Sequence, residues 1–190
     1  TREKLFQNNQ KITDQIFVEQ EKALSKSAKL LVVPEGTLKA NFNFQEPSKI
    51  NTLIGGFRIE KNSTRNSLLA FRKGDKFYSD FVDKYRLVPL GEKIPKVFHK
   101  FLNLSSLGGI EPGNQKRYFE WENSPPFAAI ICYEITDGLK IKNAVQDGSK
   151  FILAIANLDP YPSRIFNQYL SLVRMRSIEN NIDTVISSNT

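Results

Sequence analysis

The stretch "FAAIICYEITDG", residues 127–138, contains Cys132, the only cysteine of the chain. The residues before Cys132 form a continuous apolar run rather than an alternating one, and polar residues follow directly after it. Continuous apolar runs are typical of strands that are buried on both faces, as in layered α/β folds. The stretch therefore predicts a buried strand that ends at a thiol. That thiol is either a packing residue or a reactive nucleophile.

The rest of the chain extends this pattern in both directions. Apolar runs predict further strands at residues 30–36, 52–59, 66–74, 150–157 and 183–189, and helical periodicity predicts helices at residues 10–29, 138–148 and 164–181. In the first helix we expect Ile12, Ile16 and Ala23 near one face, with Phe17 and Leu24 beside them. Gly148 is expected to cap the second helix. Together these elements predict an α/β fold with layered, buried sheets.

Length and composition limit the possible classes of protein. The chain has 190 residues and a hydrophobic fraction of 40%, enough for one domain with a substantial core. Its net charge of +7 fits nucleic acid, an anionic lipid surface or no specific partner. Lys and Arg are scattered among acidic residues, which argues against nucleic acid.

Metal binding and membrane spans are also limited by composition. A single cysteine and a single histidine, His99, argue against a zinc site or a histidine cluster, and His99 is expected at the surface. No run approaches the ~20 apolar residues that a membrane-spanning helix needs, and no signal peptide is recognisable. The abrupt start and end of the chain suggest an excerpt from a longer protein.

Polar residues stand where several of the predicted strands end. The runs end at Glu35, Cys132 and Asn157, and sites in α/β sheets lie beyond the carboxyl ends of strands. Lys84 could add an ammonium group at that edge. A carboxylate, a lysine and a cysteine suffice for acyl transfer, because the carboxylate takes the thiol proton and the lysine favours the thiolate and stabilises the oxyanion. From the residues alone, an isolated cysteine at a strand end is more often a packing residue, a Pro-Glu-Gly sequence is usually a turn with a solvated acid, and a lone lysine is almost always at the surface.

Three segments of the chain resemble the catalytic segments of a known superfamily. "VVPEGT" (32–37), "DKYRLVPLGEKIP" (83–95) and "FAAIICYE" (127–134) are similar to those of the nitrilase superfamily of carbon–nitrogen hydrolases, in the same order. The middle segment, and "GGIEPGNQ" (108–115), resemble the bacterial apolipoprotein N-acyltransferases rather than the soluble amidases. The resemblance covers nearly the whole chain. It implies a nitrilase-like α-β-β-α sandwich formed by one domain, residues 1–190, truncated at both ends and lacking the first and last strands.

The resemblance also implies roles for individual residues. Glu35 matches the general base, Lys84 the lysine that stabilises the oxyanion, and Cys132 the nucleophile. No metal and no organic cofactor is implied.

Further positions match supporting residues of the superfamily. Glu92 matches a second glutamate, although it could simply cap a backbone N–H. Tyr133 and Glu134 follow the nucleophile, and either could have a packing or hydrogen-bonding role only. The segment "ANLDPYPS" (156–163) departs from the Trp-Phe-Gly pattern of the family. We expect this loop, with Asn157 and Tyr161, to line a substrate pocket, or Tyr161 to belong to a rigid turn.

The function implied is the last step of bacterial lipoprotein maturation. An acyl chain would pass from a phospholipid to Cys132 as a thioester, and then to the N-terminal amine of a diacylglyceryl-cysteine on an apolipoprotein. The domain would lie on the periplasmic face of the inner membrane, held by flanking helices that this sequence does not contain. The alternatives are a soluble amidase that uses the same three residues, and a binding module that has lost activity. The presence of Glu35, Lys84 and Cys132 together argues against the last of these.

Overall fold

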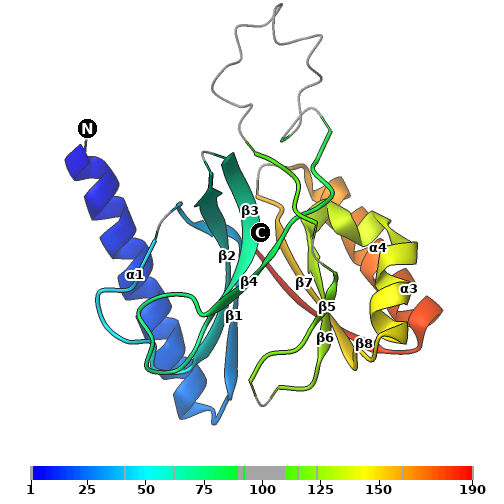
Figure 1. Ribbon diagram of the computed structural model, residues 1–190, viewed down its shortest axis with the longest axis horizontal. Coiled ribbons are helices and arrows are strands. Elements are labelled where there is room, and N and C mark those ends of the chain that lie inside the picture. The colour runs from blue at the N-terminus through cyan, green and yellow to red at the C-terminus, as the bar shows by residue number, and fades with distance from the viewer. Residues whose placement is uncertain are drawn as a thin grey trace, which may run out of the picture.

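The computed structural model describes residues 2–40, 42–61, 63–89, 92, 110–114, 116–122, 124–159 and 161–189. Its elements are, in chain order, α1 (Arg2–Ser25), β1 (Leu30–Leu38), β2 (Asn51–Glu60), β3 (Ser63–Phe71), β4 (Asp80–Asp83), β5 (Tyr118–Phe119), β6 (Phe127–Ile131), the short 3-10 helix η1 (Cys132–Thr136), α3 (Gly138–Gln146), β7 (Phe151–Asn157), α4 (Ser163–Asn180) and β8 (Asp183–Asn189). Two sheets lie face to face between α1 on one side and α3 with α4 on the other (Figure 1). The predicted α-β-β-α sandwich is thereby confirmed.

Each sheet has four strands. The first has the order β1-β2-β3-β4, with β1 parallel to β2 and the other pairs antiparallel. The second has the order β5-β6-β7-β8, in which β6, β7 and β8 run parallel. Parallel strands place their carboxyl ends at one edge, so the residues that follow β6 and β7 lie close together.

The core consists of two apolar clusters, one on each face of the first sheet, because successive side chains along a strand point to opposite faces. In β3, Leu68 lies in the apolar cluster between the two sheets, whereas its neighbour Leu69 lies in the cluster beneath α1. The central strand β6 is buried along its whole length. Burial on both faces explains why the sequence of β6 is a continuous apolar run rather than an alternating one.

Helix α1 ends four residues before the predicted boundary. Ser27 adopts a left-handed conformation (φ 58°), Ala28 N–H donates to the carbonyl of Ala23, and Ser27 N–H donates to that of Leu24. This pattern of hydrogen bonds is a Schellman motif. Glycine usually occupies its left-handed position, so a serine there gave no signal of a helix end in the sequence.

The buried face of α1 was predicted only in part. Ile16 is buried as expected, but Leu24 is 42% exposed. Among the described side chains of the helix, Gln20 is fully buried, and its amide donates to Ser48 at 2.9 Å and to Thr52 at 3.1 Å. Gln20 lies four residues after Ile16, on the buried face of the helix, and a glutamine whose amide is satisfied in this way can occupy such a core position.

The other elements differ from prediction mainly at their ends. α3 is followed by Gly148 (φ 115°), as predicted, and α4 begins one residue earlier than expected. β1 does not stop at the Pro-Glu-Gly sequence but continues to Leu38. β4, which was not predicted, pairs with β3. The prediction for His99 lies outside the described residues.

Candidate active site

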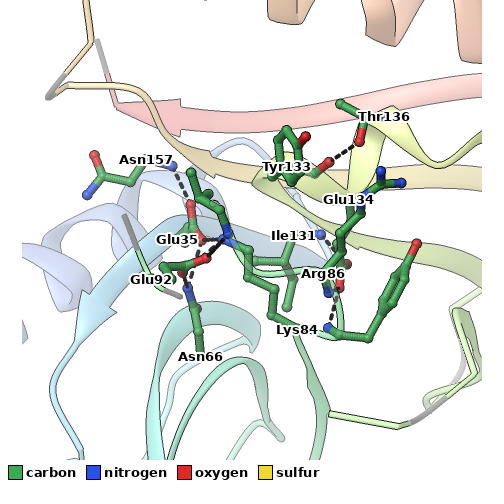
Figure 2. Close-up of polar contacts among 12 residues, drawn as sticks. Glu35, Asn66, Lys84, Arg86, Glu92, Ile131, Tyr133, Glu134, Thr136 and Asn157 are labelled. Atoms are coloured by element: carbon green, nitrogen blue, oxygen red, sulfur yellow. Dashed lines mark hydrogen bonds and ion pairs between the residues drawn. The ribbon is translucent and has the colours of Figure 1, made fainter. Parts of the chain in front are cut away.

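The three candidate catalytic side chains line one cavity at the edge where the strands end. The cavity has a volume of about 230 Å³, and Glu35, Lys84 and Cys132 all contribute to its walls, together with Asn66 and Glu92. Figure 2 shows Lys84 between the two carboxylates, with its Nζ 2.8 Å from Glu35 Oε1 and 2.8 Å from Glu92 Oε2. The structure therefore brings together residues that lie 49 positions apart in the sequence.

Glu35 reaches the cavity through an irregularity in β1. The pairing of β1 with β2 shifts register between Val33 and Leu38, so the backbone at Glu35 lies very close to β2. At Gly55 of β2 a Cβ atom would stand only 2.3 Å from Glu35 Cα, which requires glycine at that position. The carboxylate is then held by Asn157, whose N–H donates to Glu35 Oε2 at 2.9 Å.

Lys84 follows the last residue of β4 and lies on the inner face of the first sheet. Its N–H donates to the carbonyl of Asn66 at 2.7 Å, which extends the pairing of β4 with β3 by one residue. Because side chains alternate along a strand, Asp83 points to the opposite face, where Arg58 Nε donates to it at 2.7 Å and Ser67 Oγ donates to it at 2.7 Å. Adjacent residues of one strand therefore belong to different polar clusters.

Cys132 stands at the junction between strand β6 and the 3-10 helix η1. Its φ of 50° lies in the left-handed region, which non-glycine residues rarely adopt. Such a conformation costs of order 1–3 kcal/mol and is retained only where the surrounding structure imposes it. The sharp turn directs the chain away from the sheet at Cys132, so that this side chain reaches the cavity beyond the strand end.

The pKa of the Cys132 thiol is raised to about 12 by burial and by the negative charge of Glu35. Lys84 lowers the pKa, as the sequence predicted, but its effect is smaller than that of burial and of Glu35. The thiol is therefore protonated near neutral pH. The sulfur has to lose its proton as it reacts.

The ammonium of Lys84 remains charged although it is buried. Burial lowers its pKa, but attraction by the carboxylates of Glu35 and Glu92 outweighs that effect and raises the pKa above its ordinary value. Lys84 is only 1% exposed. The cavity therefore contains a fixed positive charge, the feature that stabilises an oxyanion in acyl transfer.

Glu92 and Asn66 connect the polar groups of the cavity. Glu92 Oε2 accepts the N–H of Val88 at 2.8 Å, so Glu92 both caps a backbone N–H and binds Lys84. Asn66 Nδ2 donates to Glu35 Oε1 and to Glu92 Oε1, at 2.8 Å in each case. Asn66 was not predicted as a site residue. Its only signal in the sequence is a polar side chain at the start of the buried run of β3.

Glu134 lies outside the cavity, in a fully buried ion pair. Arg117 Nη1 donates to both of its oxygens, at 3.0 and 3.2 Å, and the N–H groups of Ile131 and Tyr85 donate at 2.9 and 2.6 Å. Arg117 Nη2 also donates to the carbonyl of Asp83 at 2.8 Å. The pair therefore joins the neighbours of Lys84 to a neighbour of Cys132 (Figure 2 shows the contacts of Glu134). Of the two predicted readings of Glu134, the geometry matches the hydrogen-bond acceptor.

Tyr133 and the loop after β7 border the site. Tyr133 lies beside Arg86, whose guanidinium carbon is 5.3 Å from the ring centre, and its carbonyl accepts the hydroxyl of Thr136. Asn157 lines the cavity, and its Oδ1 accepts from Asn189 at 2.9 Å. Tyr161 lines the cavity as well and is 41% exposed. Asn157 and Tyr161 of this loop therefore contribute to the walls of the cavity.

Two further observations concern metals and membranes. Among the described residues, no three His, Cys, Asp or Glu side chains are arranged to hold a metal ion. None of the helices in the described ranges is both long and apolar enough to cross a bilayer.

The same fold occurs in solved structures of one superfamily. Nit3 of Saccharomyces cerevisiae, described as a member of branch 10 of the nitrilase superfamily, aligns with a TM-score of 0.68 at 16% identity, over 96% of this chain and 71% of that one. A mutant of the amidase from Nesterenkonia AN1 aligns equally well, at 14% identity over 95% of this chain and 70% of the other. The fold is that of the nitrilase-superfamily carbon–nitrogen hydrolases.

Sequence relatives narrow the comparison within that class. The chain is 56% identical over its whole length to an apolipoprotein N-acyltransferase of Prochlorococcus marinus subsp. pastoris, and 46% identical over 90% of its length to that of Prochlorococcus marinus strain SARG. No family model matches the chain. Over nearly its whole length the chain is similar to these apolipoprotein N-acyltransferases. It spans 38% of the length of the first relative and 34% of the second.

Proposed function

We propose that this chain is the catalytic part of an N-acyltransferase that moves an acyl chain from a phospholipid to the N-terminal amine of an apolipoprotein, through a thioester on Cys132. The observation that carries the proposal is the shared cavity of Glu35, Lys84 and Cys132. The names of the relatives favour an acyltransferase over an amidase with the same three residues.

In the first half-reaction the sulfur of Cys132 attacks the ester carbonyl carbon of the phospholipid. Glu35 accepts the thiol proton as the carbon–sulfur bond forms, which is needed because the thiol is protonated at rest. Lys84 stabilises the negative charge on the carbonyl oxygen. The carbon–oxygen ester bond then breaks. The leaving alkoxide takes the proton from Glu35, which gives a lysophospholipid and an acyl-enzyme.

In the second half-reaction the free amine of the diacylglyceryl-cysteine attacks the thioester carbonyl carbon. Glu35 accepts a proton from the amine while Lys84 again stabilises the oxyanion. The carbon–sulfur bond breaks, the thiolate takes the proton from Glu35, and an amide is released. Both half-reactions use the same groups, so one set of catalytic side chains serves donor and acceptor.

Glu92 and Asn66 support the chemistry without exchanging protons with substrate. Glu92 binds Lys84 on the side opposite Glu35, and Asn66 donates to both carboxylates. Like charges at short range raise one another's energy, and the shared ammonium and amide offset that repulsion. We propose that these contacts hold Glu35 in position while its protonation state changes.

The proposed donor is a lipid, so the protein is expected to act at a bilayer. We propose the periplasmic face of a bacterial inner membrane, where lipoproteins are matured, with no role for nucleic acid. The scattered positive charge of the chain is compatible with an anionic lipid surface.

The test uses the whole protein in detergent with a phospholipid donor and a synthetic diacylglyceryl-cysteine peptide. The proposal predicts that the peptide gains the mass of one acyl chain, and that the Cys132→Ser variant yields no such product. Small aliphatic amides are offered in a parallel reaction. Hydrolysis of those amides without acylation of the peptide would overturn the proposal in favour of the amidase.

A further inference from the structure

A second cavity adjoins the first at the sulfur of Cys132. It has a volume of about 300 Å³ and lies between η1, the loop after β7 and helix α4. Cys132, Val88 and Tyr161 line both cavities, so the nucleophile stands at their junction. We call this second space the α4 cavity.

The two cavities differ in chemistry. The first is lined by the carboxylates of Glu35 and Glu92 and by the ammonium of Lys84. The α4 cavity is lined largely by apolar side chains, among them Leu158, Ile165 and Leu172, and its polar lining residues, such as Gln168 and Tyr169, carry no charge. An alkyl chain in the first cavity would remove charged groups from their polar surroundings, which is costly. In the α4 cavity it would gain about 0.8 kcal/mol for each methylene buried.

We propose that the α4 cavity binds the acyl chain of the thioester, beginning at the carbons next to Cys132. This inference rests on the proposed function and identifies the substrate class of the site as linear aliphatic acyl groups. The carbonyl carbon bound to sulfur lies at the junction, with its oxygen directed to Lys84 and its alkyl substituent directed to α4. The first cavity then remains open for the leaving alcohol and, afterwards, for the incoming amine.

This division has a consequence for selectivity. If the alkyl substituent lies against α4, side chains of that helix limit how long a chain can be held near the sulfur. Leu172 is partly buried against the core and lines the α4 cavity. A larger side chain there should shorten the space without touching Glu35 or Lys84.

The experiment compares Leu172→Trp with a matched substitution on the same helix, Ile178→Trp. Ile178 is 80% exposed and does not line the cavity. The whole protein is incubated in detergent with an equimolar mixture of phospholipids carrying short, medium and long acyl chains, without acceptor. Intact-protein mass spectrometry then gives the distribution of chains on the enzyme.

The inference predicts that the Ile178→Trp variant loads the same distribution as the wild type. The Leu172→Trp variant should lose long chains relative to short ones by at least about tenfold, the factor that corresponds to burying roughly two methylenes fewer. Its reaction with iodoacetamide, a small reagent, should keep the wild-type rate, which shows that the site is intact. An unchanged distribution in a folded Leu172→Trp variant overturns the inference.

Two further outcomes are distinguishable. If Leu172→Trp does not fold, the Leu172→Ala variant takes its place, and the inference predicts a shift toward longer chains. An unchanged distribution in that variant overturns the inference too. If the wild type acquires no acyl group from any donor, the proposed function itself fails, and the inference fails with it.

Discussion

Two buried clusters of charged side chains lie near each other in this molecule, and they differ in the balance of positive and negative charge. The first surrounds the cavity, where one ammonium, Lys84, faces the carboxylates of Glu35 and Glu92. The second is the pair of Arg117 and Glu134, whose side chains are 1% and 0% exposed. In that pair one positive charge meets one negative charge, and backbone N–H groups donate to both carboxylate oxygens.

The difference indicates what each cluster can do. The carboxylate of Glu134 has a counter-charge in Arg117 and hydrogen bonds to both of its oxygens, so this pair is suited to fix the relative positions of its neighbours. The cluster at the cavity has an excess carboxylate, so it can accept a proton while Lys84 keeps its charge. We call the cluster at the cavity (Glu35, Lys84 and Glu92) the open cluster and the pair of Arg117 and Glu134 the closed cluster. Proton transfer takes place in the open cluster, and the closed cluster keeps the surrounding segments in position.

The largest expected effect is at the sulfur. Cys132→Ser should lower the rate of peptide acylation by about 10⁴-fold or more, because the thioester cannot form and a hydroxyl is a far weaker nucleophile at its ordinary pKa. Stability should change little, since serine is nearly isosteric with cysteine. The rate is followed by the mass of the peptide product. Residual acylation within tenfold of the wild type would contradict the role of Cys132.

The two carboxylates of the open cluster should differ in importance. Glu35→Gln should lower the acylation rate by about 10²–10⁴-fold, the range for loss of a general base. Glu92→Gln should cost less, about tenfold, because Glu92 contacts Lys84 and not the thiol. The measurement is the turnover rate of each variant at saturating donor. Equal losses in both variants would mean that the general base has been assigned wrongly.

The closed cluster should affect stability most. Arg117→Met leaves Glu134 buried without its cation and should lower the free energy of unfolding by about 3–5 kcal/mol. Arg174→Met, an exposed position on α4, is the matched control and should change it little. Denaturant unfolding in mild detergent measures the free energy of unfolding of both variants. A loss below 1 kcal/mol for Arg117→Met would show that the pair does not hold the fold.

The pH dependence of thiol reactivity provides a smaller but specific test. Because the pKa of Cys132 is raised to about 12, the rate of alkylation by iodoacetamide should rise about tenfold per pH unit between pH 7 and 10, as the thiolate fraction grows. Glu35→Gln removes a negative charge that raises the pKa, so its curve should shift to lower pH. Peptide mass spectrometry identifies the alkylated residue. A plateau near neutral pH in the wild type would contradict the protonated resting thiol.

The smallest effect is expected at Tyr169. Its hydroxyl is buried beside the α4 cavity and has no hydrogen-bond partner among the described residues. Tyr169→Phe should therefore leave stability unchanged or increase it by up to about 1 kcal/mol, because no hydrogen bond is lost and an unsatisfied group is removed. Acyl loading should be retained. The midpoint of thermal unfolding measures stability, and the mass of the acyl-enzyme measures acyl loading. A clear loss of stability would reveal an unrecognised hydrogen-bond partner of the hydroxyl.

Much of the sandwich could be predicted because its strands are continuous apolar runs. The strands at 127–131 and 151–157 and the helices around them follow from pattern alone, and the strand ends predicted that Glu35 and Cys132 would meet. Lys84 required the family resemblance, since an isolated lysine gives no signal. The structure places these side chains together, and their individual roles stay predictions.

What could not be predicted depends on contacts between distant residues. The register shift in β1 depends on the close approach of Gly55, and the left-handed turn at Cys132 depends on the surroundings of η1. Arg117 precedes β5 and Glu134 follows β6, and these two charged residues, ordinary in sequence, become a pair only when the two neighbouring strands lie side by side. The raised pKa of Cys132 follows from burial, which no local pattern reports.

The thioester is the most direct test of the account. The whole protein is incubated with phospholipid in detergent without acceptor, and its mass is measured before and after the apolipoprotein peptide is added. The account predicts one added acyl group, located on Cys132, that disappears as the peptide gains the same mass. Formation of acylated peptide while Cys132 stays unmodified at every time point would contradict it.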